Sequence, residues 1–293
     1  MVRNALVVLL ALAALAAPVH AKINIAASTN DIGSIAASVG GEQVDVFAIA
    51  RPNSDPHRIE ALPSYMVKVS RAAIYLKVGL GLDQWAGAIV DGSRNSKLQM
   101  VDCSVGVRVL EKPTGKVDAS MGDVHPDGNP HYWLDPRNAA AVATNIAAAL
   151  ARTDPKNAAL YQQRAEAFGK DAQACWQRNA EAAKKIPSHA IFTYHRSWSY
   201  FADAFGFEVV NTVEPVPGIP PTARHLQELV DQARARKVGV LVQEPYFSAD
   251  GGKFLNRQAG VRLLVQAASC DAPAAGSYLK NFDTIMAGLA GGQ

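Results

Sequence analysis

Short apolar runs and segments with helical character alternate along most of the chain. The apolar runs predict strands at 23–27, 44–48, 73–78, 100–102 and 107–110 and, later, at 190–193, 209–213, 238–242 and 262–267. Helices are expected between them at 31–39, 63–70, 82–89, 138–151, 198–205, 223–235, 254–259 and 277–289. Strands that alternate with helices are typical of parallel sheets, so the predicted fold class is α/β.

A long polar-rich segment from 156 to about 185 divides the chain. Its apolar positions, such as Ala165, Phe168 and Ala172, fall at steps of three and four residues, as on one face of a helix. A helix of that length measures roughly 40 Å at 1.5 Å per residue, which is longer than one small domain requires. We expect it to join two lobes as a rigid connector that ends at Pro187.

The first 21 residues have the pattern of a secretory signal peptide. Arg3 gives a positive start, 5–17 is an apolar run, and Val19-His20-Ala21 is a small-x-small cleavage site. The run is shorter than the roughly 20 apolar residues that span a membrane. Lys22 rather than a cysteine follows the cleavage site, so we expect a periplasmic protein without a lipid anchor.

About 270 mature residues exceed the usual size of a single core, which favours two lobes. The predicted organisation is an N-terminal α/β lobe at 22–153, a connecting helix at 154–186 and a C-terminal α/β lobe at 187–293. Lys and Arg number 29 against 26 Asp and Glu, and so small a positive balance does not indicate nucleic acid or anionic lipid as a partner. A monomer is expected.

The chain has three cysteines, an odd number. In a compartment that permits disulfides, Cys103, Cys175 and Cys270 predict one bridge and one remaining thiol, with the pairing open. There is no CxxC motif in the sequence, which disfavours a zinc site built on cysteine.

Three histidines share one local context. His57, His131 and His195 each follow a predicted strand or extended loop and precede a helix, and ligands of α/β sheets bind at the carboxyl ends of the strands. Two of them come from the first lobe and one from the second, so a site that uses all three lies between the lobes. Neutral imidazoles suit zinc, and three of them leave a fourth position for a carboxylate or water.

His131 lies in a stretch that is rigid by composition. Pro130 and Pro136 each fix φ and favour an extended residue before them, so 131–135 is expected to be stiff and non-helical. Asp135 is expected to cap the next helix, with Pro136 at its first position. The preceding loop at 111–130 is rich in glycine and aspartate and is expected to be mobile.

The remaining mature histidines are weaker candidates. His125 belongs to that loop, His189 precedes a strand, and His225 lies early on a helix. Unperturbed imidazoles have a pKa near 6.5, so metal affinity is expected to fall below about pH 6.

Four motifs together resemble a known family. They are Asp-Pro-His-Arg-Ile-Glu at 55–60, Gly-Asn-Pro-His-Tyr-Trp-Leu-Asp-Pro at 128–136, Tyr-His-Arg-Ser-Trp-Ser-Tyr-Phe at 194–201 and Glu-Pro-Val-Pro-Gly-Ile-Pro-Pro at 214–221. In this order they are similar to those of the periplasmic zinc and manganese receptors of ABC importers, the cluster A-I solute-binding proteins. The resemblance covers nearly the whole mature chain. It implies two α/β lobes joined by one long helix, with a metal between them on three histidines and an acidic residue.

By this resemblance, the three histidine ligands of the family correspond to His57, His131 and His195. Manganese-type members often have a glutamate at the position of His195, so the resemblance implies Zn²⁺. The family's acidic ligand usually lies just after the last strand, where this sequence has no carboxylate, and Asp271 comes a few residues late. Asp271 is the first choice for the fourth ligand; the alternatives are Glu60, Glu244 and water.

The predicted function is capture of Zn²⁺ and its delivery to an ABC-type membrane permease, with a periplasmic metallochaperone as a further candidate partner. Two alternatives are a manganese receptor of the same family and a secreted zinc-dependent hydrolase. A hydrolase needs a general base beside the metal-bound water, as in HExxH. The sequence has no HExxH, and Glu60 is the nearest substitute, so the protein is not expected to be an enzyme.

Overall fold

The computed structural model describes residues 21–115, 117–118 and 121–291 of the 293-residue chain. The predicted signal peptide therefore lies outside the described residues, except for Ala21. None of the helices in the described ranges is long and apolar enough to cross a membrane.

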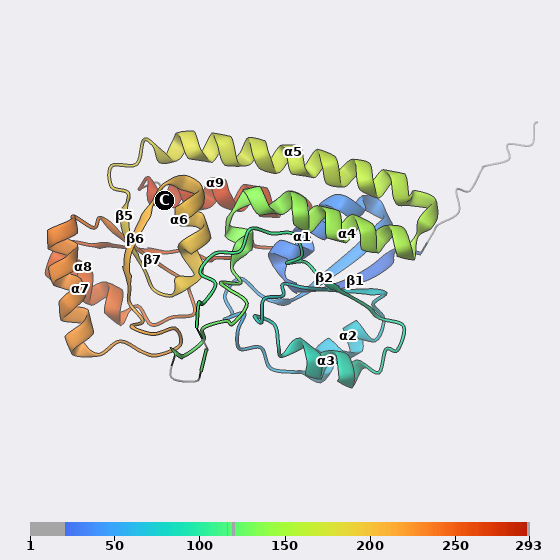
Figure 1. Ribbon diagram of the computed structural model, residues 1–293, viewed down its shortest axis with the longest axis horizontal. Coiled ribbons are helices and arrows are strands. Elements are labelled where there is room, and N and C mark those ends of the chain that lie inside the picture. Colours follow the sequence, from blue (N-terminus) through green and yellow to red (C-terminus); the bar gives the residue numbers. More distant parts are fainter. Residues whose placement is uncertain (1–20, 116, 119–120, 292–293) are drawn as a thin grey trace, which may run out of the picture.

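Two four-stranded parallel sheets form the centres of two lobes (Figure 1). The first sheet has the order β2-β1-β3-β4 and consists of β1 (Ile23–Thr29), β2 (Val44–Ala50), β3 (Ile74–Lys77) and β4 (Gln99–Asp102). The second has the order β6-β5-β7-β8 and consists of β5 (Ala190–Thr193), β6 (Glu208–Thr212), β7 (Val240–Gln243) and β8 (Arg262–Val265). Both lobes therefore repeat one strand order, and the α/β prediction is confirmed.

Helices cover both sheets. They are α1 (Asn30–Gly40), α2 (Pro63–Val69), α3 (Ala86–Ser93), α4 (Ala139–Thr153), α5 (Ala158–Ala183), α6 (Ser199–Phe205), α7 (Ala223–Arg236), α8 (Asp250–Ala259) and α9 (Ser277–Leu289). Most expected boundaries differ from these by a few residues. The chain at 107–110 is irregular, so the strand expected there was wrong.

The 26-residue helix α5 runs along both lobes, as predicted (Figure 1). Its buried side chains include Tyr161, Phe168 and Cys175, and they belong to a core that also contains residues of both lobes. Phe168 packs toward Tyr278 of α9, with ring centroids 6.2 Å apart. Because one core extends from lobe to lobe, α5 holds the two sheets in a defined relation.

A second connection between the lobes lies at the start of α1. The buried carboxylate of Asp31 accepts hydrogen bonds from the Ser269 hydroxyl and, at 3.0 Å, from the Cys270 backbone N–H. The Trp133 indole donates to the Ala268 carbonyl at 2.8 Å. These bonds fix the segment after β8 to the first lobe, and this segment includes the neighbours of Asp271.

The expectation of a disulfide was wrong. Cys103, Cys175 and Cys270 are all free and buried. They follow β4, lie on α5 and follow β8, respectively, and each fills a different part of the interior as a small apolar side chain. Burial also raises the pKa of the Cys175 thiol to about 11.

Candidate metal site

Three histidine rings from both lobes meet between the sheets. The ring centroids of His57 and His131 are 5.1 Å apart, those of His57 and His195 5.2 Å, and those of His131 and His195 5.6 Å. One ring nitrogen of each lies within 4.8 Å of the other two. His57 and His195 come from the segments just after β2 and β5, at the carboxyl ends of the two sheets, and the long loop after β4 brings His131 to them.

Two of the histidines are held by the same short motif. In Asp55-Pro56-His57, the Asp55 Oδ1 accepts from the His57 backbone N–H and from its Nδ1, both at 2.9 Å. In Asn129-Pro130-His131, the Asn129 Oδ1 accepts from the same two groups of His131, at 3.0 and 2.9 Å.

Proline has no N–H and keeps the residue before it extended, so the side chain of that residue folds over to the histidine. The structure adds a 3-10 turn at Tyr132–Leu134, so the prediction of a wholly non-helical segment at 131–135 was wrong. The Asp135 cap is confirmed: its side chain accepts from the Arg137 N–H, with Pro136 at the first position.

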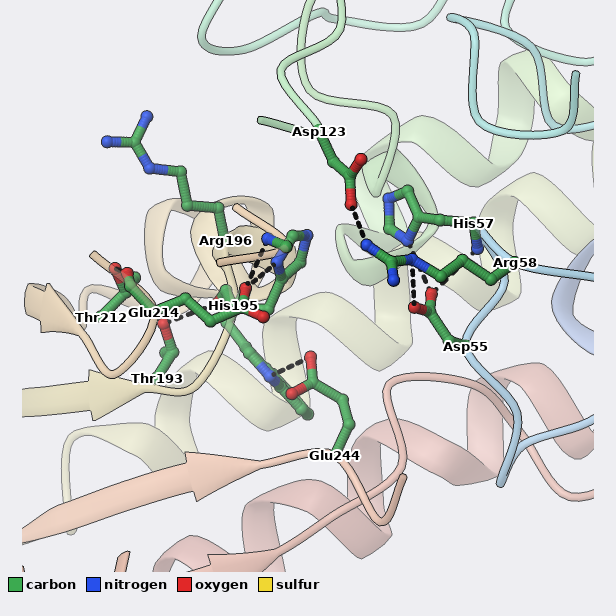
Figure 2. Close-up of polar contacts among 12 residues, drawn as sticks. Asp55, His57, Arg58, Asp123, Thr193, His195, Arg196, Thr212, Glu214 and Glu244 are labelled. Carbon is green, nitrogen blue, oxygen red and sulfur yellow. Dashed lines mark hydrogen bonds and ion pairs between the residues drawn. The ribbon is translucent and has the colours of Figure 1, made fainter. Parts of the chain in front are cut away.

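His195 is held by a carboxylate from the neighbouring strand end. Its Nδ1 lies 2.7 Å from the Glu214 Oε2, and both side chains are buried (Figure 2). The Thr193 hydroxyl donates to the His195 carbonyl, and the Thr212 hydroxyl donates to the Glu214 carbonyl. The last residues of β5 and β6 thus shape the two turns that bring this pair together.

These partners fix the protonation pattern of the imidazoles. The carboxylates of Asp55 and Glu214 can only accept, so Nδ1 of His57 and His195 carries the hydrogen. The Asn129 amide nitrogen donates to Glu111 and to the Arg196 carbonyl, which leaves its oxygen for His131. All three Nε2 lone pairs are therefore free to bind a cation, as in metal-ligating histidines whose other nitrogen donates to an acceptor.

The free nitrogens have no protein partner. Nε2 of His57 and Nε2 of His131 are buried without a hydrogen bond within the described ranges. Leaving a buried polar atom unsatisfied costs about 1–3 kcal/mol, so the arrangement indicates a ligand. Tetrahedral zinc at about 2.0–2.1 Å from each nitrogen would separate the nitrogens by roughly 3.4 Å. In the structure the three nitrogens lie within 4.8 Å of one another, so the histidine side chains need to move only slightly toward each other to bind the ion.

Charge and burial tune the site. Burial lowers the pKa of His131 well below its usual value, helped by the neighbouring imidazoles, so this ring stays neutral. Burial also lowers the pKa of His195, but the Glu214 hydrogen bond and the charges of Glu244 and Glu214 outweigh it, and the net shift is upward. Burial raises the pKa of Asp55, but its bonds to His57 dominate and lower it overall.

The carboxylates named as fourth-ligand candidates lie elsewhere. Among the described residues, the group of possible ligands contains only the three histidines. Asp271 is exposed, because the bonds of Asp31 to Ser269 and Cys270 fix the backbone just before it. The choice of Asp271 as fourth ligand is therefore not supported, and Glu60 is exposed as well.

Glu244 is fully buried near His195. Its Oε1 accepts from the Trp198 indole at 3.1 Å, and its Oε2 has no partner in the described part of the chain; Figure 2 labels Glu244 near His195. Burial raises its pKa to about 7. When it is ionised, above about pH 7, it adds negative potential behind His195 without belonging to the ligand group.

Two other histidines have structural roles. Both ring nitrogens of His189 are bonded to backbone carbonyls, and Nε2 of His225 bonds the Thr212 carbonyl. His125 differs, because its ring stacks on His57 at a centroid distance of 5.3 Å and its Nε2 is buried without a partner among the described residues.

Sequence reasoning missed Asp55, Asn129 and Glu214 as residues that orient the histidines. The signal for the first two was present, since an Asx-Pro-His triplet occurs at both 55–57 and 129–131. Glu214 follows β6 as His195 follows β5, and adjacent parallel strands place such residues side by side.

Comparison with known proteins gives a consistent picture. The model of the family described as ZnuA, the periplasmic zinc-uptake complex component A, matches residues 25–292. The manganese-binding lipoprotein MntA of Halalkalibacterium halodurans is 24% identical over 277 residues, which cover 91% of this chain and 88% of that protein.

Solved structures show the same fold. A crystal structure of ZnuA is similar with a TM-score of 0.78 and 26% identity, over 93% of this chain and 99% of that chain. A ZnuA deletion mutant with zinc bound gives a TM-score of 0.76 and 26% identity, over 92% and 97%.

Proposed function

The chain belongs to the family of periplasmic zinc-uptake component A proteins, and on that premise we propose that it is a periplasmic receptor that captures Zn²⁺ for an ABC-type importer. The observation that carries this proposal is the set of three imidazoles with Nδ1 occupied and Nε2 free. We assign His57, His131 and His195 as the ligands of the transported ion.

The donor atoms favour zinc over manganese. Imidazole nitrogen suits Zn²⁺, whereas Mn²⁺ prefers carboxylate, carbonyl and water oxygens. Because the described ligand group holds nitrogen donors alone, the alternative of a manganese receptor is the weaker one, although MntA is named for manganese.

The carboxylates behind the ligands balance the charge of the ion. Asp55 and Glu214 bond two of the imidazoles and lie one ring away from the ion position. A dication on neutral ligands keeps its full charge, and two carboxylates at this distance compensate it without entering the coordination shell.

The geometry gives less support to a zinc-dependent hydrolase. A hydrolase would need a base beside the metal-bound water, and Glu60, the nearest substitute in the sequence, is exposed. Family members are substrate-binding proteins, and we propose binding and delivery rather than catalysis for this chain.

We infer a periplasmic location from the predicted signal peptide. We propose that residues 1–21 are cleaved, that Lys22 begins a mature monomer without a lipid anchor, and that lobes at 22–153 and 187–293 flank a connector at 154–186. The partner is the membrane permease of the importer, and a metallochaperone is a further candidate.

Metal analysis of protein purified without chelator tests the proposal. We expect one zinc per chain, zinc that outcompetes manganese, and loss of most zinc affinity in His57→Ala. A wild type that binds no zinc, or a His57→Ala variant with unchanged affinity, would refute it.

A further inference from the structure

Among the described histidines outside the ligand group, His125 alone has a buried ring nitrogen without a hydrogen bond. Its ring stacks on the ring of His57 with an interplanar angle of 28°. Its Nε2 is buried and has no hydrogen bond to any described residue, like Nε2 of His57 and of His131. The His125 ring has one backbone hydrogen bond, with Gly81, whereas the bonded ring nitrogens of His189 and His225 all meet backbone carbonyls.

The residues just before His125 are fastened to both lobes. The Asp123 N–H donates to the Pro217 carbonyl of the second lobe at 3.0 Å. The Asp123 carboxylate accepts from Arg58 of the first lobe at 3.3 Å, as Figure 2 shows. Arg58 follows His57 directly, so this ion pair ties the loop to the ligand itself.

Gly122 makes the contact with the second lobe possible. Its φ is +68°, and a Cβ at this position would lie 2.1 Å from the Pro217 carbonyl oxygen. Pro217 lies next to Gly218, whose N–H donates to the Glu214 Oε2 that holds His195. The loop is therefore fitted against the supports of two ligands, and it brings His125 to the side of the site where His131 and His195 line a common pocket with it.

The same site lacks an acidic fourth donor. In the described residues the ligand group holds three nitrogens and no carboxylate, and Asp271 and Glu60 are exposed. Asp55 and Glu214 already supply two negative charges behind the imidazoles. A neutral fourth ligand is therefore electrostatically acceptable, and zinc sites are usually four-coordinate.

We propose that His125 is the fourth ligand of the bound zinc ion, so that the loaded site has four imidazole nitrogens. This inference rests on the proposed function and names the loop residue that completes its site. In the described structure His125 is stacked just outside the three-histidine group, and its ring tilts toward the open position when the ion is bound. Because all four donors are nitrogen, His125 also selects against Mn²⁺.

X-ray absorption of the zinc-loaded protein tests the proposal by counting imidazoles. We expect four in the wild type and three plus one oxygen in His125→Ala. Competition titration should give a loss of zinc affinity of at least about tenfold in His125→Ala, as removal of even an outer partner of a metal ligand costs this much. The ratio of zinc affinity to manganese affinity should also be smaller in His125→Ala than in the wild type.

The matched control is His189→Gln, which removes a histidine whose nitrogens bond the Ala183 and Gly206 carbonyls. It should keep four imidazoles on zinc and the wild-type affinity. Gly122→Ala tests whether the contact between Gly122 and Pro217 positions His125. We expect this variant to give the same X-ray absorption spectrum as His125→Ala, although His125 is still present.

Three imidazoles in the wild type, or an unchanged shell and affinity in His125→Ala, would overturn the inference but leave the proposed function intact. Wild-type protein without zinc affinity would instead refute the proposed function. The two failures are therefore distinguishable.

Discussion

The Nδ1 of His195 lies 2.7 Å from a carboxylate oxygen of Glu214, which follows the adjacent strand. This pair combines two effects. The bond frees Nε2 for a metal, and the charge of Glu214 helps to raise the pKa of His195 against the opposing effect of burial. Zinc therefore has to displace a proton from His195 at a higher pH than from an unperturbed imidazole.

The first prediction concerns this proton. A ligand with a raised pKa loses zinc as the pH falls through that pKa, so affinity should begin to fall above the ordinary histidine pKa of about 6.5 rather than below about pH 6. Glu214→Gln lowers the pKa of His195, so its affinity loss should begin at lower pH. At mildly alkaline pH the variant should bind zinc up to about 10-fold more weakly than wild type, because Gln keeps an oxygen that can accept from Nδ1 but removes the negative charge behind His195.

Zinc competition titrations between about pH 5 and pH 8 measure both effects. Identical pH profiles for the variant and the wild type would contradict the assigned role of Glu214.

A second prediction separates charge from orientation at His57. Asp55→Asn keeps an oxygen that can accept from the His57 backbone and Nδ1, as Asn129 does for His131, but removes the negative charge. Asp55→Ala removes both. We expect zinc affinity to decrease in the order wild type, Asn, Ala, with a loss of about 10-fold to 100-fold for Ala. Equal affinity of all three proteins would show that the Asx-Pro-His motif does not orient the ligand.

The sequence predicted the α/β class, the long helix α5 and the three clustered histidines because these depend on local patterns. Apolar periodicity predicts α5, and each histidine follows a strand or an extended loop and precedes a helical segment. The exposure of Asp271, the first choice for the fourth metal ligand, could not be predicted. It depends on how Asp31 fixes the segment after β8 through a hydrogen bond from Ser269, which is 238 residues away in the sequence. The burial of Nε2 of His125 depends on tertiary contacts of the same kind.

A third prediction follows from the position of Asp271. Because its side chain is exposed and outside the ligand group, Asp271→Ala should bind zinc as tightly as the wild type. Glu244 is fully buried close behind His195, so Glu244→Gln should weaken binding moderately by removing negative potential. Isothermal titration with a competing chelator compares them. A larger loss in Asp271→Ala than in Glu244→Gln would restore Asp271 as the ligand.

The last prediction concerns stability and the bond between the lobes at Asp31. Burial raises the pKa of Asp31 from 3.8 to about 6, against the lowering effect of the Ser269 and Cys270 hydrogen bonds. Between about pH 4 and pH 6 the folded protein keeps this proton while the unfolded chain has lost it, so the contribution of Asp31 to the free energy of unfolding falls as pH rises. The shift corresponds to about 3 kcal/mol.

Asp31→Asn cannot titrate, so the free energy of unfolding of this variant relative to the wild type should increase as pH rises from about 4 to about 6 and then stay constant. Below about pH 4 the variant is expected to be less stable than the wild type. The neutral carboxyl of Asp31 still presents two oxygens to Ser269 and Cys270, whereas Asn replaces one of them with an amide nitrogen that cannot accept a hydrogen bond. Urea unfolding at four pH values checks this, with the exposed Asp271→Asn as a control that should show no such trend. A difference between Asp31→Asn and wild type that is the same at every pH would mean that Asp31 is already ionised throughout the range, and that the bonds to Ser269 and Cys270 outweigh its burial.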